Sequence, residues 1–438
     1  MISNNIKKRI IVFTKLPEPG TCKTRLISVL SSLNSAHLQK KMTSHIINIS
    51  ENYCKKDSSC ELEIRFFGKC DKNMPDLWKN HFYREQSGKN LGDKMFQAIS
   101  QALSEGTEQV ILTGSDCIDI SAELIEQAFN LLAKNDVVAG PALDGGYYII
   151  GVKKSIKKLF PPDMPWGSNS VLKKTLKIVN KLSLKHALLK KLSDVDTPSD
   201  LSRFCHTSFF KDMPLPIISV IIPTLNEETN IADTIKSITA PSVEIIVCDG
   251  GSTDATRKIA KKHGAIVVES ERGRGFQQNK GTAIAKAAIL LFLHADTLLP
   301  KNFLKEVFKI LSTSGTSAGA FRLKISGSNQ ALNIVQFFTN LRSIFFQLPY
   351  GDQAIFVKKN LFQKVGGFPD ITIMEDYVLV RKLKKHGRIL ISPCSVITSG
   401  RRWDTIGYLK TLIINQLMII SYHMNVKIER LENLYKKF

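Results

Sequence analysis

Long apolar runs, closely paired cysteines and clustered charges are all missing from this sequence of 438 residues. No apolar stretch reaches the roughly 20 residues that a membrane-spanning helix needs, so we expect no such helix. The eight cysteines include no Cys-x-x-Cys pair, which disfavours a zinc ribbon or a thioredoxin-like site. The first nine residues contain no cleavable apolar region, so we expect no signal peptide and a cytoplasmic protein.

Acidic residues are also scarce, because 39 Asp and Glu stand against 61 Lys and Arg, for a net charge of +22. Such an excess predicts attraction to nucleic acid, an anionic membrane surface or phosphorylated ligands. It is spread along the chain, with +9 in residues 1–215 and +13 in residues 216–438. No zinc-finger spacing, RNA-recognition motif or arginine-rich arm is present, so we expect no nucleic-acid partner. A lysine-rich composition and peripheral association with the inner face of the membrane stay open as explanations.

Strand and helix patterns alternate along the chain, and the series begins twice. Buried-strand patterns at residues 10–13 and 217–222 are each followed by a proline-containing loop. Because continuous apolar runs suit parallel strands covered on both faces, this alternation predicts two tandem α/β domains with mostly parallel sheets. A connector with two prolines at 211–216 would separate a domain of residues 1–210 from one of residues 217–438. We expect further strands at 110–113, 136–139, 243–248, 265–269 and 288–294, and helices at 122–133, 231–238 and 253–263.

In the second half, polar residues follow the predicted strands, where doubly wound sheets bind their ligands. Asp249 and Gly250 follow one strand, and a carboxylate beside a glycine can meet a ribose or base edge. A glycine turn with a helix cap is the structural alternative. Asp296 follows another strand and could ligate a divalent cation that bridges two phosphates. His294 is either a second ligand or a packing residue.

Further along the second half, adjacent acids and a basic aromatic cluster complete the pattern. Glu375 and Asp376 precede a predicted helix, so they are either a helix cap or a general base that deprotonates an acceptor hydroxyl. Arg401 and Arg402, next to Trp403, offer guanidinium and aromatic groups for a diphosphate or a sugar ring.

Over about residues 217–403, the order and spacing of these motifs resemble the family 2 inverting glycosyltransferases of GT-A fold. The resemblance implies transfer of a sugar from a nucleotide-diphosphate sugar to a hydroxyl acceptor, with Asp376 as the catalytic base beside Glu375. It also implies Mg²⁺ or Mn²⁺ at Asp296, although His294 stands where the first Asp of the metal motif usually lies. The implied donor-site residues are Pro223, Thr224, Glu227, Asp249, Gly250, Arg401, Arg402 and Trp403, and the implied acceptor-side residues are Gly351, Asp352 and Gln353.

The tail of the second half carries a narrower resemblance. Residues 406–424 are rich in Leu, Ile and Tyr, and a helix pattern follows at 426–431. The apolar run within them is short and interrupted, so we expect a core or interfacial helix. The tail resembles that of family 2 glycosyltransferases named for arsenosugar biosynthesis.

The first half has a proline- and glycine-containing loop that ends in Lys23 and Arg25 near a helix start. No second glycine directly precedes Lys23, so the loop is not a Walker A motif. Basic side chains and backbone N–H groups at a helix start can still hold phosphates, and plain solvated side chains are the alternative. Asp116 follows the strand at 110–113 as a metal ligand would, and Asp144 is a further acid in a later loop.

Over about residues 9–203, the first half resembles the glycosyltransferase-like nucleotidyltransferase family of unknown function. The matching motifs are Lys15-x-Pro17-x-Pro19-Gly20-x-x-Lys23-Thr24-Arg25, Gly114-x-Asp116, Asp144-Gly145-Gly146-Tyr147 and Trp166-Gly167. The resemblance implies a second GT-A-like domain, with a nucleotide's phosphates at Lys15, Gly20, Lys23 and Arg25 and a divalent cation at Asp116, Asp144 and Asp196.

Several activities stay open at this point. The first half is either a nucleotidyltransferase, which would make the chain bifunctional, or a second nucleotide-sugar transferase, or a binding domain without catalysis. The second half could also act at a membrane surface on a lipid or polysaccharide acceptor.

Overall fold

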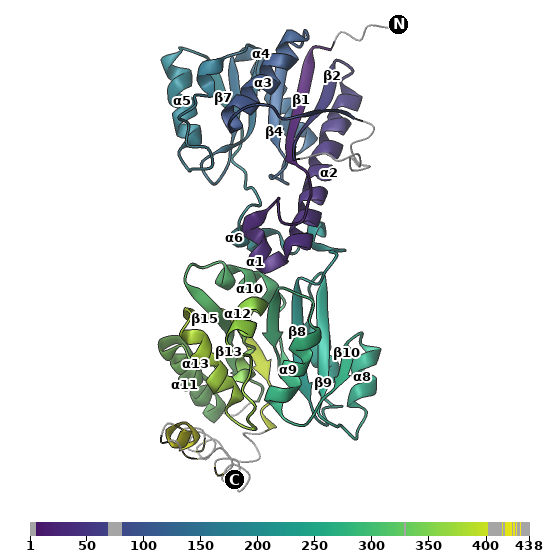
Figure 1. Cartoon of the computed structure of the whole chain (residues 1–438), viewed down its shortest axis with the longest axis vertical. Coiled ribbons are helices and arrows are strands. Elements are labelled where there is room, and N and C mark those ends of the chain that lie inside the picture. The colour runs from purple at the N-terminus through teal and green to yellow at the C-terminus, as the bar shows by residue number, and fades with distance from the viewer. Residues whose placement is uncertain are drawn as a thin grey trace. The chain divides into compact units, whose positions relative to one another are not determined.

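The computed structural model describes residues 6–68, 81–327 and 330–401, together with residues 414, 417–422, 424, 426 and 430. The chain divides into two compact units (Figure 1). Unit 1 contains Met1–Thr24 and Ser35–Asp196, and unit 2 contains Arg25–Asn34 and Thr197–Phe438. Arg402, Trp403 and most of the predicted helix at 426–431 lie outside the described residues.

A short segment from early in the chain belongs to unit 2, and it includes helix α1 (Ile27–Leu30). Asn34 fastens this segment, because its Nδ2 donates to the Leu215 carbonyl at 2.9 Å and its Oδ1 accepts from the Leu215 N–H at 3.0 Å. Helix α6 (Pro198–Phe204) also packs in unit 2. The compact units therefore divide differently from the connector at 211–216, which stays a prediction of where the two family domains meet.

Unit 1 is built on a seven-stranded sheet in the order β3-β2-β1-β4-β6-β5-β7. The strands are β1 (Lys8–Lys15), β2 (Cys60–Phe67), β3 (Phe82–Glu85), β4 (Gln109–Gly114), β5 (Val137–Pro141), β6 (Tyr147–Val152) and β7 (His186–Leu188). All neighbouring pairs are parallel except the two that involve β6. The sheet is therefore mostly parallel.

Helices cover both faces of this sheet, because the strand residues alternate between two apolar clusters. Ile10 packs on one face with helices α2 (Ser32–Lys56) and α4 (Ala122–Lys134). Ile11 packs on the other face with helices α3 (Leu91–Ser104) and α5 (Val171–Lys181). Burial on both faces explains why β1 reads as a continuous apolar run.

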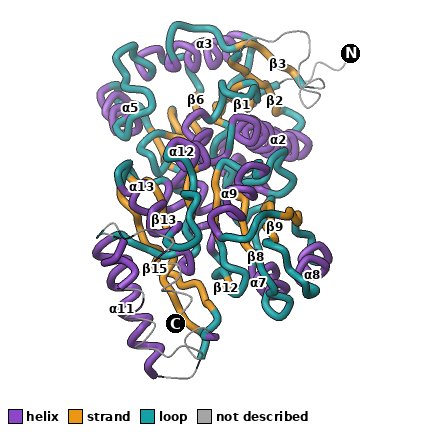
Figure 2. The backbone as a smooth tube through the Cα atoms, turned by 60° about the horizontal axis from the view of Figure 1, so that its bottom comes forward, coloured by secondary structure: helices purple, strands orange, loops and turns teal. Residues whose placement is uncertain are grey.

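Unit 2 has an eight-stranded sheet in the order β10-β9-β8-β11-β14-β13-β15-β12. The strands are β8 (Ile218–Thr224), β9 (Val243–Asp249), β10 (Ile266–Glu269), β11 (Ile289–Phe292), β12 (Thr297–Leu298), β13 (Thr316–Ile325), β14 (Phe356–Lys358) and β15 (Arg388–Thr398). Its remaining helices are α7 (Ile231–Ser237), α8 (Thr256–Lys262), α9 (Arg274–Ile284), α10 (Phe303–Leu311), α11 (Gln330–Phe346), α12 (Lys359–Lys364) and α13 (Glu375–Lys384). The tube in Figure 2 follows this alternation of strands and helices.

The two sheets share one topology. Strands β8, β9, β10, β11, β13, β14 and β15 repeat the order of β1 to β7, and β14, like β6, is antiparallel to both of its neighbours. The expected α/β class with mostly parallel sheets is confirmed, as are the expected strands and helices up to residue 401, to within about three residues at either end. None of the described helices has both the length and the apolar character needed to cross a bilayer.

Candidate functional site

A cavity of about 560 Å³ lies in unit 2 where β8 and β11 end. The loops after these strands face the start of α13 across it, because the ends of parallel strands meet at one edge of a sheet. The predicted site residues that line it are Pro223, Thr224, Glu227, His294, Asp296, Asp352, Glu375 and Asp376. Residues far apart in the sequence thus converge on one cavity, as a ligand site requires.

One wall of this cavity carries two carboxylates held by one guanidinium. Arg401 Nη2 donates to Glu227 Oε1 at 2.9 Å and to Oε2 at 2.8 Å, and it lies 3.5 Å from Asp296 Oδ2. Glu227 follows β8, Asp296 follows β11 and Arg401 follows β15. The guanidinium therefore lies where the sequence predicted a divalent cation.

The chemistry of this donor set fits a metal ion, although no preformed site is present. Among the residues that the structure describes, no group of three or more His, Cys, Asp or Glu side chains is arranged to hold one. Carboxylate oxygens are the ligands that Mg²⁺ and Mn²⁺ prefer, and a positive group already lies beside both carboxylates. His294 lines the same cavity and approaches Gly351, because a Cβ on that glycine would lie 2.9 Å from His294 Nε2.

The opposite wall carries the adjacent acids at the start of α13. Asp376 Oδ2 accepts the Gly351 N–H at 2.7 Å, and Asp376 Oδ1 accepts the Tyr377 N–H at 2.7 Å. Glu375 is buried, and burial together with the neighbouring charge of Asp376 raises the pKa of Glu375 to about 7, against the opposing effect of Arg274. Asp376 is thus fixed by backbone donors, and Glu375 is the acid that changes protonation near neutral pH.

Asp249 does not line this cavity, although it was predicted to contact the nucleotide. Its side chain is fully buried, and Oδ2 accepts the N–H groups of Gly251 at 3.1 Å and Ser252 at 2.9 Å. The Nε of Arg257 lies 3.8 Å from the same oxygen. Asp249 therefore stabilises the loop after β9. Its contact with a nucleotide stays a prediction. Gly250 is likewise absent from the cavity lining.

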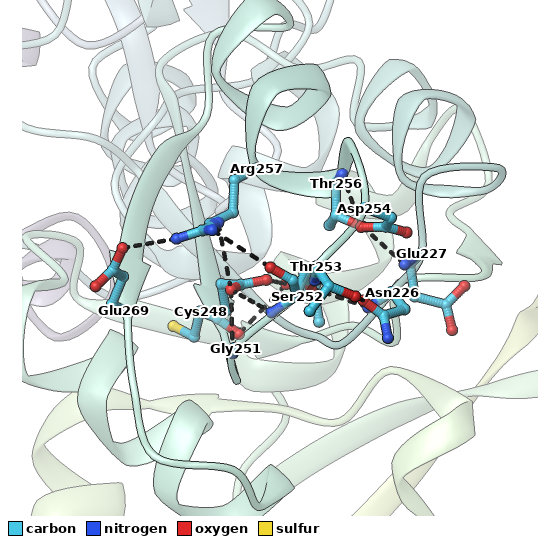
Figure 3. Close-up of polar contacts among 12 residues, drawn as sticks. Asn226, Glu227, Cys248, Gly251, Ser252, Thr253, Asp254, Thr256, Arg257 and Glu269 are labelled. Atoms are coloured by element: carbon cyan, nitrogen blue, oxygen red, sulfur yellow. Dashed lines mark hydrogen bonds and ion pairs between the residues drawn. The ribbon is translucent and has the colours of Figure 1, made fainter.

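The loops after β8 and β9 are clamped together by side chains that the sequence analysis missed (Figure 3). The Asn226 N–H donates to Ser252 Oγ at 2.9 Å, and Asn226 Oδ1 accepts the Thr253 N–H at 2.9 Å. The Glu227 N–H donates to Thr256 Oγ1 at 2.8 Å. These bonds position Glu227, and a run of Asn, Ser and Thr after two strands was their signal in the sequence.

Other missed residues supply charge and a scaffold. Arg272 and Arg274 line the cavity at the start of α9, and a helix N-terminus with two arginines suits an anionic ligand. Gln277 is buried, and its Nε2 donates to the carbonyls of Thr224 and Cys248 at 2.8 and 2.7 Å. This amide ties the ends of β8 and β9 together.

On the acceptor side, the predicted motif forms a short 3-10 turn over Gly351–Gln353. Gln353 is buried, with Oε1 accepting from Ser343 Oγ at 2.6 Å and Nε2 donating to the Phe321 carbonyl at 3.0 Å. Gln353 therefore anchors the turn, and Asp352 is the member of the motif that lines the cavity.

Unit 1 has its own cavity of about 560 Å³ at the corresponding edge of its sheet. Its lining includes five predicted residues: Lys15, Lys23, Asp116, Asp144 and Asp196. Gly20 and Arg25 are not part of the lining, and Arg25 belongs to unit 2. Lys94 and Trp166 line it as well, so this cavity offers further positive charge and an aromatic face.

At the centre of this second cavity, Lys23 is buried against oxygen atoms. Its Nζ lies 2.8 Å from Asp116 Oδ1, 3.9 Å from Asp196 Oδ1 and 2.6 Å from the Val195 carbonyl, to which it donates. Asp144 Oδ1 accepts the Gly146 N–H at 2.8 Å within its own loop. The predicted metal ligands of unit 1 are therefore engaged with a lysine and a turn.

Two family models match parts of the chain. Residues 51–168 match "Uncharacterized protein conserved in bacteria (DUF2064)", and residues 219–366 match "Glycosyl transferase family 2". The predicted relation of the second half to family 2 is confirmed. The family matched by the first half is described without a function, so its nucleotidyltransferase activity stays a prediction.

Two relatives of the chain are named glycosyltransferases. Glycosyltransferase AglE of Haloferax volcanii is 28% identical over 173 residues, which cover 36% of this chain and 57% of that protein. The PGL/p-HBAD biosynthesis glycosyltransferase of Mycobacterium bovis is 29% identical over 167 residues, or 36% of this chain and 64% of that protein. The chain thus spans less than two thirds of the length of either relative.

Solved structures similar to the chain include sugar-nucleotide enzymes. One is a proposed nucleotide-diphospho-sugar transferase from Desulfovibrio desulfuricans G20, with 30% identity, coverage of 48% of this chain and 91% of that one, and a TM-score of 0.42. Another is the mannosyltransferase PcManGT from Pyrobaculum calidifontis in complex with GDP-Man and Mn²⁺, with 23% identity, coverage of 48% and 63%, and a TM-score of 0.37.

Proposed function

We propose that unit 2 transfers a sugar from a nucleotide-diphosphate sugar to a hydroxyl acceptor, with inversion at the anomeric carbon. The observation that carries this proposal is the cavity that pairs the acids Glu375 and Asp376 with the cluster of Glu227, Asp296 and Arg401. It lies in the part of the chain that matches family 2 glycosyltransferases. Glu227 and Asp296 come from the loops in which such a fold holds its ligands, and the two acids lie in the first turn of α13.

The chemistry assigned to the residues is a single displacement. Asp376 accepts the proton of the acceptor hydroxyl while that oxygen attacks the anomeric carbon and the bond to the diphosphate breaks. Arg272 and Arg274 offset the charge of the diphosphate. Glu227 and Asp296, with His294 nearby, would hold Mg²⁺ or Mn²⁺, which would supply further positive charge against the leaving diphosphate.

Unit 1 is assigned a preceding step. A nucleotidyltransferase would use a nucleoside triphosphate and a sugar phosphate to make the activated sugar, with release of pyrophosphate. Lys15, Lys23 and Lys94 in its cavity support a phosphorylated ligand. A second sugar transfer or simple nucleotide binding are the alternatives, and a lack of pyrophosphate release with every sugar phosphate offered would favour them.

Donor binding tests the assignment of unit 2. UDP- and GDP-sugars should each be screened with Mn²⁺ for an increase in melting temperature of the full chain, because a ligand stabilises the state that binds it. We expect a shift with at least one sugar nucleotide that is lost in Asp296→Asn and kept in Asp233→Asn, an exposed acid on α7 outside the cavity. Equal shifts in both variants would contradict the assigned donor site.

The resemblance of the tail at 406–431 extends the proposal to an acceptor used in arsenosugar biosynthesis, and the first nine residues, which contain no cleavable apolar region, extend it to a cytoplasmic setting. These assignments rest on the sequence alone.

A second candidate function, transfer at a membrane surface, is favoured by helix α11. One face of this helix is apolar and exposed, including Phe337, Phe338 and Phe345, which are 61%, 55% and 72% exposed. Figure 2 shows α11 beside β13 and β15, and Tyr350 of the cavity follows it closely in the chain. An exposed apolar helix close to the acceptor-side turn would suit a lipid acceptor. The net charge of +13 in this half of the chain would attract an anionic membrane surface.

Sedimentation with vesicles containing phosphatidylserine tests this second function. The chain should sediment at low salt, and Phe337→Ser combined with Phe345→Ser should abolish sedimentation, whereas the exposed Ile266→Ser on β10 should not. A chain that stays in the supernatant at low salt would exclude membrane association of this kind.

A further inference from the structure

Because the two sheets share one topology, the same pair of loops is in contact within each unit. In unit 1, the Val195 N–H donates to the Asp116 carbonyl at 2.9 Å, which joins the loop after β7 to the loop after β4. In unit 2, the Ser399 N–H donates to the Asp296 carbonyl at 3.1 Å, which joins the loop after β15 to the loop after β11. Asp116 and Asp296 therefore occupy equivalent places in their sheets.

Around each of these aspartates, the loops after the first, fourth and last of the seven shared strands contribute one charged residue each. Unit 1 contributes Lys23, Asp116 and Asp196, in that order. Unit 2 contributes Glu227, Asp296 and Arg401. Each cluster thus has two carboxylates and one base, but the base comes from the first loop in unit 1 and from the last loop in unit 2.

The two bases differ sharply in their surroundings. The side chain of Lys23 is 2% exposed, and a backbone carbonyl accepts one of its protons in addition to the carboxylates. The side chain of Arg401 is 53% exposed, and its guanidinium contacts the carboxylates of Glu227 and Asp296. Arg401 can therefore turn into solvent at small cost, because an exposed ion pair contributes little stability.

Lys23 cannot be displaced in the same way. Its removal would take the ion pair from Asp116, and it would leave the buried carbonyl of Val195 without the donated bond. Lys23 also has φ of 47°, in the left-handed region, so its backbone is committed to this position. The ammonium fills the place that the sequence analysis gave to a divalent cation.

We propose that the cavity of unit 1 binds its ligand with the ammonium of Lys23 as its built-in cation, and that Asp116 and Asp196 hold no divalent metal ion. The residues of this site do not fit a metal ion for as long as Lys23 stays between the two carboxylates. The ligand class is unchanged, an anionic phosphorylated compound, because Lys15 and Lys94 line the same cavity. This inference concerns unit 1 and stands apart from the sugar transfer assigned to unit 2.

A titration of the full chain with Mn²⁺ tests this inference without any assay of activity. The bound ions are counted from the decrease in the electron paramagnetic resonance signal of free Mn²⁺. Asp116→Asn should bind as many Mn²⁺ ions per chain as the unaltered protein does. Lys23→Met, which uncovers the two carboxylates, should bind one more, and Asp116→Asn in the Lys23→Met background should remove that additional ion.

A fall in bound Mn²⁺ in the Asp116→Asn single variant would overturn the proposal. A folded Lys23→Met variant, verified by circular dichroism, that binds no additional ion would overturn it too. If Lys23→Met does not fold, the single variant alone decides. Asp296→Asn serves as the separate probe of unit 2, so a failure of the metal site there leaves the result for unit 1 unaffected.

Discussion

Gly351 donates its backbone N–H to Oδ2 of Asp376 at 2.7 Å, and this bond joins the acceptor-side turn to the proposed catalytic base. A glycine is required there because a Cβ would lie 3.3 Å from that oxygen and 2.9 Å from His294 Nε2. The turn, the histidine and the base therefore form one packed unit at the cavity wall.

Gly351→Ala should push His294 aside and shift Asp376 by a few tenths of an ångström. A misplacement of about 1 Å can cost roughly 100-fold in rate, so for this smaller shift we expect kcat for sugar transfer to fall by up to roughly 10-fold. Donor binding should persist, because Gly351 makes no contact with Glu227, Asp296 or Arg401 in the described hydrogen bonds and ion pairs. Steady-state kinetics together with calorimetric titration of the donor would check this, and a variant with unaltered kcat would show that the bond to Gly351 does not position the base.

The buried acid Glu375 makes stability depend on pH. The unfolded chain releases this proton near the ordinary Glu pKa of 4.5, whereas burial keeps it on the folded chain until a pKa of about 7. The folded state therefore holds more protons between these values, and raising the pH through this window lowers the free energy of unfolding.

Glu375→Gln should remove this dependence. Urea unfolding at pH 5 and at pH 8 should show a loss of stability in the unaltered chain that is clearly smaller in the variant. The same loss in both proteins would mean that another group titrates in this range.

Asn226 should stabilise the loop after β8, which carries Glu227. Asn226→Ala loses the hydrogen bond to the Thr253 N–H, and alanine has no side-chain bond to offset the cost of a left-handed backbone at φ of 54°. We therefore expect a destabilisation of about 1–3 kcal/mol and a higher KM for the donor. Asn226→Gly keeps the backbone freedom and loses only the bond, so it should be milder on thermal unfolding. A glycine variant that is the worse of the two would refute the role of the backbone conformation.

A buried ion cluster should dominate the stability of unit 1. Glu63 is fully buried between Arg9 and Arg65. Glu63→Ala would remove a carboxylate from the buried Arg65, whereas Arg9 keeps Glu61 and Glu105, and it should cost about 3–5 kcal/mol in the free energy of unfolding. Glu108→Ala, which breaks an exposed pair with Lys7, should cost about 0–1 kcal/mol. Chemical denaturation of both variants tests this, and equal losses would show that burial does not govern the effect.

Local patterns were enough to predict several of the described strands and helices and several residues that line the cavity. Asp296 follows a strand and Asp376 starts a helix, and both features are visible in a short window of sequence. Asp249 follows a strand in the same way, yet the loop turns its carboxylate inward to the N–H groups of Gly251 and Ser252. The position of a residue along a strand does not say which way the next loop turns.

Contacts between distant segments were the part that local patterns could not supply. Residues 25–34 belong to unit 2, where two hydrogen bonds join Asn34 to Leu215. A periodic sequence pattern does not predict such a contact between distant residues. Lys23 was predicted as a phosphate ligand from its loop, whereas its burial against Asp116 depends on the folded sheet. Arg272 and Arg274 lie between the end of β10 and the first turn of α9, and nothing in that short window of sequence marks them as lining the cavity.

The central claim is that Asp376 is the base for sugar transfer in the cavity of unit 2. Its most direct test is the rate of nucleoside diphosphate release from the sugar nucleotide that binds best, with acceptor present, in the unaltered chain and in Asp376→Asn. General base catalysis typically contributes about 100- to 10,000-fold, so the account predicts a loss of at least 100-fold with an unaltered dissociation constant for the donor. Release by Asp376→Asn at the rate of the unaltered chain would contradict it.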